Sequence, residues 1–261
     1  MLKLRVITSV IALVVIGVVL FVIPPDYAEP IIGLLLLAGA WEWSGFLNLP
    51  GTALRGLYTA IIGACLVAVQ SVVPEMAGTV LMVAAAWWFV AFLWTLAYPT
   101  KIPLPLRWVC GLLVLVPLYV ALILLFRLGV DYLLFTLLIV WAADAGAYFA
   151  GKTFGRVKLA PAISPGKTWE GVIGGLVVVA ALAIGVGIWR DLNIGVFLPF
   201  VLAVAALSVV GDLTVSMFKR TAGVKDSGSL FPGHGGVLDR IDSVAAAAPL
   251  FALGLGWLGL V

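Results

Sequence analysis

Long runs of apolar residues, separated by short breaks that contain charged residues, proline or glycine, dominate this sequence. A helix that crosses a bilayer needs roughly 20 mostly apolar residues, because its backbone must satisfy its own hydrogen bonds in lipid. Only 10% of the 261 residues are charged, far fewer than in a soluble domain. We therefore expect an all-α, polytopic membrane protein with about nine transmembrane helices. The predicted spans are 4–23, 28–47, 56–73, 77–98, 107–126, 131–150, 171–190, 194–217 and 240–259.

These spans leave no room for a separate soluble domain, so residues 1–261 are predicted to form a single transmembrane domain. Residues 1–130 would supply helices for packing and for lipid or dimer contacts, and residues 131–261 the helices and loops that carry chemistry. The first run is too long for a signal peptide and lacks a small-residue cleavage site, so it is expected to stay as the first helix. Cys65 and Cys110 lie in apolar runs and indicate neither a disulfide framework nor zinc.

The basic residues favour one orientation of the chain. If the N-terminus is cytoplasmic, the nine spans place all but Arg127 and Arg190 of the 15 lysines and arginines on the cytoplasmic side. This asymmetry is typical of membrane proteins, and one helix more or fewer would scatter the charges over both faces. The two longest loops, 151–170 and 218–239, then both lie on the cytoplasmic side.

Three acidic residues lie deep inside predicted spans, at least five residues from either end: Glu42, Asp144 and Asp212. A carboxylate in hydrocarbon costs at least a few kcal/mol, so such a residue normally faces a cavity, a partner or an ion. We expect functional roles for Asp144 and Asp212. Glu42 lies between two tryptophans near the interface and could instead snorkel to the surface or pair with a basic residue.

Oxygen-bearing side chains flank the loop 218–239 on both sides. Asp212 and Ser216 are four residues apart and share a helix face, and Asp239 and Asp242 are three apart at the start of the last helix. Carboxylates without a histidine pair or a thiolate are typical of a site for a hard cation such as Mg²⁺. The alternative is a set of salt bridges to the neighbouring basic residues Lys219, Arg220 and Arg240.

The loop itself is rich in glycine and basic residues, which favours phosphate binding. Glycines allow backbone N–H groups to converge on an anion, and lysine and arginine supply positive charge. His234 in this loop could act as a base, but it could equally bind a phosphate or hold the loop. The glycines are Gly223, Gly228, Gly233, Gly235 and Gly236.

The earlier loop contains "SPGKTWEG", in which "GKT" resembles the end of a phosphate-binding P-loop. That motif is excluded because Pro161 stands where its first glycine is required. What remains is a second basic, hydroxyl-bearing loop suited to phosphate or to anionic headgroups. The alternative is the general excess of positive charge on the cytoplasmic side.

The run "SMFKRTAGVKDSGSLFPGHGGVLDRID", residues 216–242, resembles the signature of the phosphatidate cytidylyltransferases (CDP-diacylglycerol synthases). "SPGKTWEG" and "WAADAGAYFAGKTFG" are also similar to that family, and the likeness is strong over residues 140–243. The resemblance implies a multi-pass enzyme of the cell inner (plasma) membrane with its active-site loops on the cytoplasmic side. It would convert CTP and phosphatidate to CDP-diacylglycerol and pyrophosphate with Mg²⁺. Its expected partners are membrane lipids and a second copy of the chain in a homodimer, and no nucleic acid is expected to bind.

The resemblance also implies roles for individual residues. Asp212, Asp239 and Asp242 would form the metal-binding catalytic centre, with Mg²⁺ and room for a second cation. Lys225 and Asp226 would complete the catalytic set. The residues implied in substrate binding are Ser164, Lys167, Ser216, Lys219, Arg220, His234, Arg240 and Asp144.

Two other functions remain open from the residues. Another CTP-dependent transferase or kinase of a membrane lipid or polyprenol would need a base for its alcohol substrate. A transporter would also bury Asp144 and Asp212 in helices, but transporters usually place their site near the midplane in repeated halves, whereas these polar residues crowd one face and one half.

Overall fold

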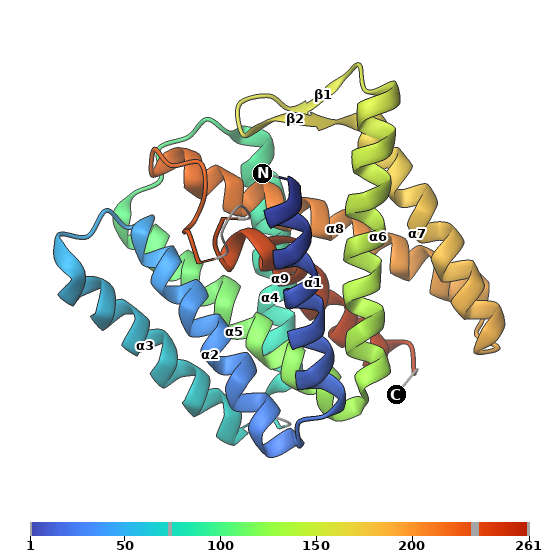
Figure 1. The fold of residues 1–261 in the computed structure, drawn as a ribbon, viewed down its shortest axis with the longest axis horizontal. Coiled ribbons are helices and arrows are strands. Elements are labelled where there is room, and N and C mark those ends of the chain that lie inside the picture. Colours follow the sequence, from blue (N-terminus) through green and yellow to red (C-terminus); the bar gives the residue numbers. More distant parts are fainter. Residues whose placement is uncertain (1, 73–74, 231–234, 260–261) are drawn as a thin grey trace.

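The computed structural model describes residues 2–72, 75–230 and 235–259. Within these ranges the chain forms nine α-helices and one short β-hairpin (Figure 1). The elements are α1 (Leu2–Phe21), α2 (Pro25–Gly45), α3 (Gly51–Val72), α4 (Ala77–Ala97), α5 (Leu104–Leu128), α6 (Val130–Phe154), β1 (Lys158–Ala160), β2 (Ser164–Thr168), α7 (Trp169–Trp189), α8 (Ile194–Thr221) and α9 (Leu238–Trp257).

The helices confirm the expected all-α membrane fold. In the described ranges, six helices are long and apolar enough to cross a bilayer: α3 to α8. Helix α1 contains a shorter apolar stretch, Val10–Phe21, while α2 and α9 carry several charged residues. That all nine helices cross the membrane therefore stays a prediction.

Helix α5 lies at the centre of the bundle. It packs against α2, α3, α4, α6 and α9, and residues on all its faces are buried. Helices α8 and α9 pack closely against each other, and α7 lies against both α6 and α8. The C-terminal helices that carry the predicted site are thus joined through α5 to the N-terminal ones (Figure 1).

Glycines bring α6 and α7 into close backbone contact. A Cβ atom added to Gly175 would lie 2.6 Å from the carbonyl oxygen of Ala143, and one added to Gly146 would lie 2.9 Å from that of Gly174. Small residues that permit such approach stabilise helix pairs in membranes through van der Waals contact.

The hairpin between α6 and α7 was not predicted. Its strands are antiparallel, with Lys158 paired to Thr168 and Ala160 to Ser164. The hairpin continues directly into α7, whose first turn is capped because the Thr168 hydroxyl accepts a hydrogen bond from Gly171 N–H at 3.1 Å. It projects from the same end of the bundle at which α1 begins (Figure 1).

Helix α8 is longer than predicted. It continues to Thr221, four residues beyond the predicted end at 217, so Lys219 and Arg220 belong to a helix and not to a loop. Their positions are therefore set by the helix geometry relative to Asp212 and Ser216, which lie on earlier turns.

Candidate active site

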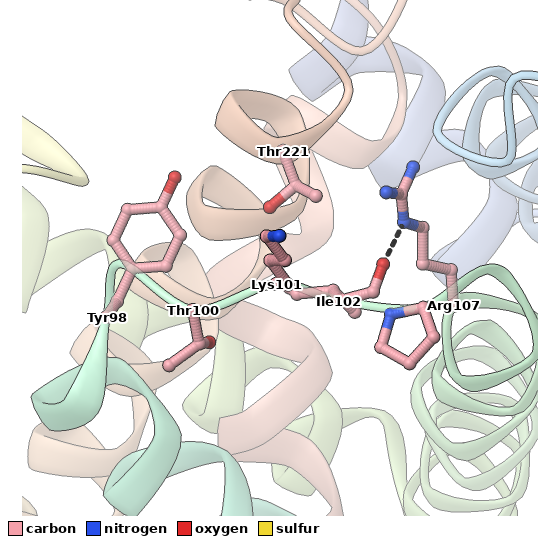
Figure 2. A pocket seen from close by; sticks show the side chains of 7 residues that line it. Tyr98, Thr100, Lys101, Ile102, Arg107 and Thr221 are labelled. Carbon is pink, nitrogen blue, oxygen red and sulfur yellow. Dashed lines mark hydrogen bonds between the residues drawn. The ribbon is translucent and has the colours of Figure 1, made fainter.

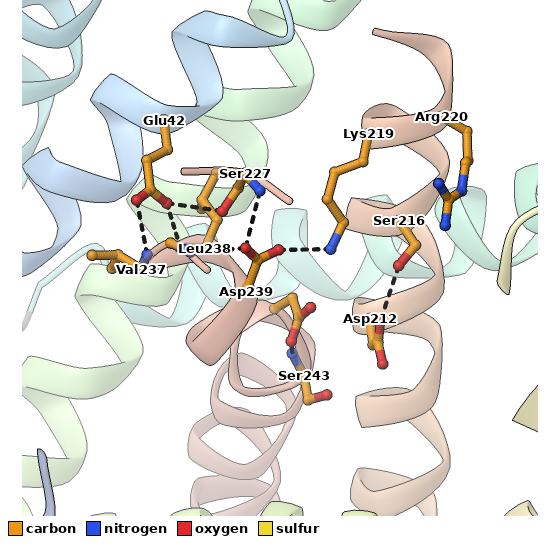
Figure 3. A network of polar contacts seen from close by, with 12 residues as sticks. Glu42, Asp212, Ser216, Lys219, Arg220, Ser227, Val237, Leu238, Asp239 and Ser243 are labelled. Carbon is orange, nitrogen blue, oxygen red and sulfur yellow. Dashed lines mark hydrogen bonds and ion pairs between the residues drawn. The ribbon is translucent and has the colours of Figure 1, made fainter. Parts of the chain in front are cut away.

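Two ion pairs form the centre of the site, and they join three elements. Lys219 Nζ on α8 lies 2.7 Å from Asp239 Oδ1 at the start of α9 (Figure 3). Lys167 Nζ on β2 lies 2.6 Å from Asp212 Oδ2 on α8. The side chains of Lys219 and Asp239 are only 10% and 8% exposed, so this pair is largely shielded from water. The salt bridge to Lys219 that was left open as an alternative is therefore present.

Three aspartates from three helices lie near one another beside these pairs. Ser216 Oγ donates to Asp212 Oδ1 at 3.1 Å, which confirms that the two residues share a helix face (Figure 3). Asp144 on α6 and Asp242 on α9 both interact electrostatically with Asp212. Asp242 is buried and accepts a hydrogen bond from Ser243 N–H at 2.8 Å. The fold thus gathers Asp144, Asp212 and Asp242 from distant parts of the sequence.

The N–H groups of the glycine-rich loop converge on anions, but in the described part these are carboxylates of the protein itself. Ser227 N–H and Gly236 N–H donate to Asp239 Oδ2 at 3.0 and 2.9 Å. Val237 N–H and Leu238 N–H donate to Glu42 at 2.9 Å each. These four N–H groups are therefore occupied by carboxylates of the chain, and phosphate binding by the loop stays a prediction.

Asp239 is held in its ionised form by these contacts. It precedes the apolar part of α9. Burial raises its pKa, but the hydrogen bond from Gly236 N–H and the bond and charge of Lys219 more than offset this, and the pKa lies below its ordinary value.

Glu42 is the residue whose role the sequence did not indicate correctly. It neither reaches the surface nor pairs with a basic residue among the described ones, since it is 6% exposed and its partners are Ser227, Val237 and Leu238. The available signal was an acidic residue within a predicted span, but its partners lie nearly 200 residues away along the chain.

A cavity of about 360 Å³ lies between α6, α7, α8 and β2. Asp144, Lys152, Lys167 and Thr168 line it with polar groups, and apolar side chains line the rest. Its apolar lining includes Ala143, Val172, Leu176, Ala205 and Val209. A polar group next to an apolar surface is the lining that an amphiphilic ligand requires.

The remaining predicted site residues lie around this centre or apart from it. Arg220 Nε donates to the carbonyl of Ile163 at 3.1 Å, which fixes the hairpin against α8. Arg240 is exposed in the first turn of α9 and interacts electrostatically with Asp144. Lys225 and Asp226 are exposed on the loop and Ser164 is half-buried in β2, whereas His234 lies outside the described residues.

The aspartates described above have the chemistry of a site for a hard cation, because carboxylate oxygens are the ligands that Mg²⁺ prefers. Within the described ranges, however, no three Asp, Glu, His or Cys side chains lie close enough together to surround one ion. The ammonium groups of Lys167 and Lys219 lie beside Asp212 and Asp239, where they supply the positive charge.

A second hollow, of about 600 Å³, lies at the other side of α8. It is lined by Tyr98, Thr100, Lys101, Ile102, Pro103, Arg107 and Thr221. Figure 2 shows Lys101 pointing toward Thr221, and Arg107 held by a 2.9 Å hydrogen bond from its Nε to the carbonyl of Ile102. Because nine helical residues turn through about two and a half turns, Thr221 points away from Asp212, and this hollow does not belong to the aspartate cluster.

Comparison with known proteins assigns the chain to a family. Residues 3–257 match the Cytidylyltransferase family. The chain belongs to that family. A phosphatidate cytidylyltransferase of Haemophilus influenzae is 39% identical over 283 residues, which cover 97% of this chain and 98% of the relative.

Two further relatives carry the same name. The phosphatidate cytidylyltransferase of Pseudomonas aeruginosa is 42% identical over 269 residues, covering 98% of this chain and 99% of its own. The one of Staphylococcus aureus is 47% identical over 124 residues, 47% of this chain and 48% of its own.

Membership of the cytidylyltransferase family makes the chain a nucleotidyltransferase, and this restricts what the site has to do. Nucleotidyl transfer joins anionic reactants, so the protein must mainly neutralise charge and align the groups. A cytidylyltransferase with lysines and carboxylates gathered at one end of its helices has the groups for both tasks.

Proposed function

We propose that the chain is a phosphatidate cytidylyltransferase that makes CDP-diacylglycerol and pyrophosphate from phosphatidate and CTP, as a step of phospholipid biosynthesis. The observation that carries the proposal is the similarity, over nearly the whole chain, to two proteins of that name. The cavity beside Asp144 and Lys167 supports it, because a polar end and an apolar wall suit a lipid phosphate with its acyl chains.

In the proposed reaction, an oxygen of the phosphatidate phosphate attacks the α-phosphorus of CTP. A new phosphorus–oxygen bond forms, and the bond from the α-phosphorus to the oxygen that bridges it to the β-phosphate breaks. Pyrophosphate leaves with the electron pair of that bond. The lipid phosphate is already ionised near neutral pH, so the protein needs neither a nucleophile of its own nor a strong base, and His234 is not required as one.

The lysines of the two ion pairs are the proposed phosphate ligands. Lys167 lies on the cavity wall, and Lys219 lies one helical turn beyond Ser216. When the anionic substrates bind, both ammonium groups would contact phosphate oxygens, with Arg220 and Arg240 nearby. Asp212, Asp239 and Asp242 are the proposed Mg²⁺ ligands, with a second cation as an alternative. Because no three such side chains lie close enough in the described ranges, these carboxylates would have to draw together and part from Lys167 and Lys219. The metal would offset the negative charge that develops on pyrophosphate. Lys225 and Asp226 are proposed to act from the exposed loop.

The setting of the enzyme is part of the proposal. The end of the bundle that carries the site would face the cytoplasm, because the basic residues gather there and CTP is soluble. The bacterial relatives favour the inner membrane. A homodimer is also part of the proposal.

The test is to incubate the purified protein with phosphatidate, Mg²⁺ and CTP labelled in either the α- or the γ-phosphate. Cytidylyl transfer puts the α-label into the lipid, whereas a lipid kinase would transfer the γ-label. Asp239→Asn should abolish most of the transfer, and Asp26→Asn, an exposed residue in the first turn of α2, should not. Absence of α-labelled lipid with the unchanged protein would overturn the proposal, and full activity of Asp239→Asn would overturn the role of that carboxylate.

A further inference from the structure

Glu42 is a buried carboxylate with an unusual set of partners. It lies near the C-terminal end of α2 and is 6% exposed. Among the described residues, no lysine or arginine lies within 4.0 Å of it. A buried charge must be compensated by hydrogen bonds if it has no counter-charge.

That compensation comes from one segment of the chain, and only from there in the described part. Val237 N–H donates to Oε1 at 2.9 Å, and Leu238 N–H and Ser227 Oγ both donate to Oε2 at 2.9 Å (Figure 3). Two of these donors are unpaired N–H groups at the start of α9, where the helix dipole also favours a negative charge. Glu42 therefore caps α9 from another helix.

The capped segment also holds Asp239. Ser227 links the two carboxylates, because its N–H donates to Asp239 and its hydroxyl donates to Glu42. The Glu42 carboxylate also lies against the backbone of Gly228 and Gly236, where an added Cβ atom would collide with it. Gly236 N–H in turn donates to Asp239. Two of the residues that contact Glu42, Ser227 and Gly236, also donate to Asp239. The others are their close neighbours Gly228, Val237 and Leu238.

We propose that Glu42 is a positioning residue for cytidylyl transfer: it fixes the start of α9 and the loop at Ser227, and thereby places Asp239 opposite Lys219. The inference rests on the proposed function, because it concerns that reaction. The contacts from which it is argued do not depend on the proposed function. A carboxylate is needed because three donors converge on it. A glutamine has one acceptor oxygen, and its NH₂ group would face an N–H or O–H donor.

The chain offers a matched control in the same helix. Glu29 is also buried in α2 and also accepts three hydrogen bonds, from Arg127 Nε and Nη2 at 2.6 and 2.7 Å and from Gln70 Nε2 at 3.1 Å. It lies at the opposite end of α2 from the site. Glu29→Gln therefore removes a comparable buried network without touching the loop or α9.

The experiment compares Glu42→Gln with Glu29→Gln as purified full-length proteins, with activity expressed per folded molecule. Loss of a group that orients a site residue typically lowers activity or metal affinity roughly 10- to 100-fold. We expect Glu42→Gln to lower kcat by this factor and to raise the Mg²⁺ concentration needed for half-maximal activity. Amide hydrogen exchange at 235–239 should also become faster. Glu29→Gln should change none of these three quantities.

The outcomes separate this inference from the proposed function. If the unchanged protein and Glu29→Gln transfer the α-label, and Glu42→Gln does so with unchanged kcat and unchanged exchange at 235–239, the role of Glu42 is refuted while the function stands. If Glu42→Gln does not fold, Ser227→Ala tests the same link, because it removes one donor to Glu42 and leaves the backbone bond to Asp239. A lowered kcat and faster exchange in that variant support the inference, and unchanged values refute it.

Discussion

Replacing Gly175 by alanine would place a methyl group against the backbone of α6. The new Cβ atom would lie 2.6 Å from the carbonyl oxygen of Ala143 and 3.3 Å from its carbonyl carbon. Ordinary contact begins at about 3.4 Å, so α6 and α7 would have to separate by about 0.8 Å at this point. Both atoms belong to the helix backbone, and no side-chain rotation can relieve the contact.

The change in the free energy of unfolding follows from two opposing effects. Overpacking of a close contact costs about 1–3 kcal/mol, whereas alanine is better than glycine inside a helix by about 1 kcal/mol. Gly185, in the same helix, provides the control, because an added Cβ atom there has no neighbour within 4 Å. Gly185→Ala gains the helix propensity without the collision. The two variants should therefore differ in stability by about 1–3 kcal/mol, with Gly175→Ala the less stable.

The assay is thermal unfolding of both variants in the same detergent or nanodisc, together with CDP-diacylglycerol formation. The stability difference corresponds to a gap in Tm of roughly 2–12 °C. Asp144 follows Ala143 directly and lines the cavity with Gly175, so the separation should also displace the site. A misplacement near 1 Å can cost about 100-fold in rate, and we expect kcat/KM of Gly175→Ala to fall at least about 10-fold. If Gly175→Ala melts as high as Gly185→Ala, the close packing of α6 on α7 is wrong.

Three further results are expected. Lys167→Met should reduce CDP-diacylglycerol formation by at least about 10-fold, mainly through KM, since it removes the charge on the cavity wall; an unchanged KM for both substrates would contradict this. Arg127→Met leaves Glu29 with only the hydrogen bond from Gln70, and because Arg127 is 39% exposed, Tm should fall by an amount that reflects about 1–3 kcal/mol, while kcat per folded molecule stays the same. Single cysteines at Arg156 and Arg190 should react with a membrane-impermeant thiol reagent from the cytoplasmic and the outer side respectively, and the opposite pattern would invert the topology.

Much of the fold could be predicted because long apolar runs directly indicate helices that are buried in lipid. The helices α3 to α8 lie where the apolar runs are, and the contact between α6 and α7 lies where small residues recur. The hairpin at Lys158–Thr168 was missed because its strands are short and contain Pro165 and Gly166, which disfavour strands in isolation. The end of α8 was misplaced because charge ends an apolar run without ending a helix.

Within the candidate site, contacts along one helix could be predicted, but pairings between elements could not. Asp212 and Ser216 share a face because both lie on one helix, and local geometry is sufficient to predict that. The bonds of Lys167 to Asp212 and of Glu42 to α9 join residues that are distant in sequence, and a single sequence contains no measure of such distances. The role of Glu42 could therefore be found only in three dimensions.

The capping of α9 by Glu42 has a consequence for biosynthesis. A chain is made from its N-terminus, and 195 residues separate Glu42 from Val237, its first partner in α9. During translation the Glu42 carboxylate is therefore made long before its donors exist, and it must stay hydrated until the last helix arrives. The end of the bundle that carries the candidate site is consequently assembled last. A nascent chain that stops short of residue 237 keeps a carboxylate in its second helix without the backbone donors of α9.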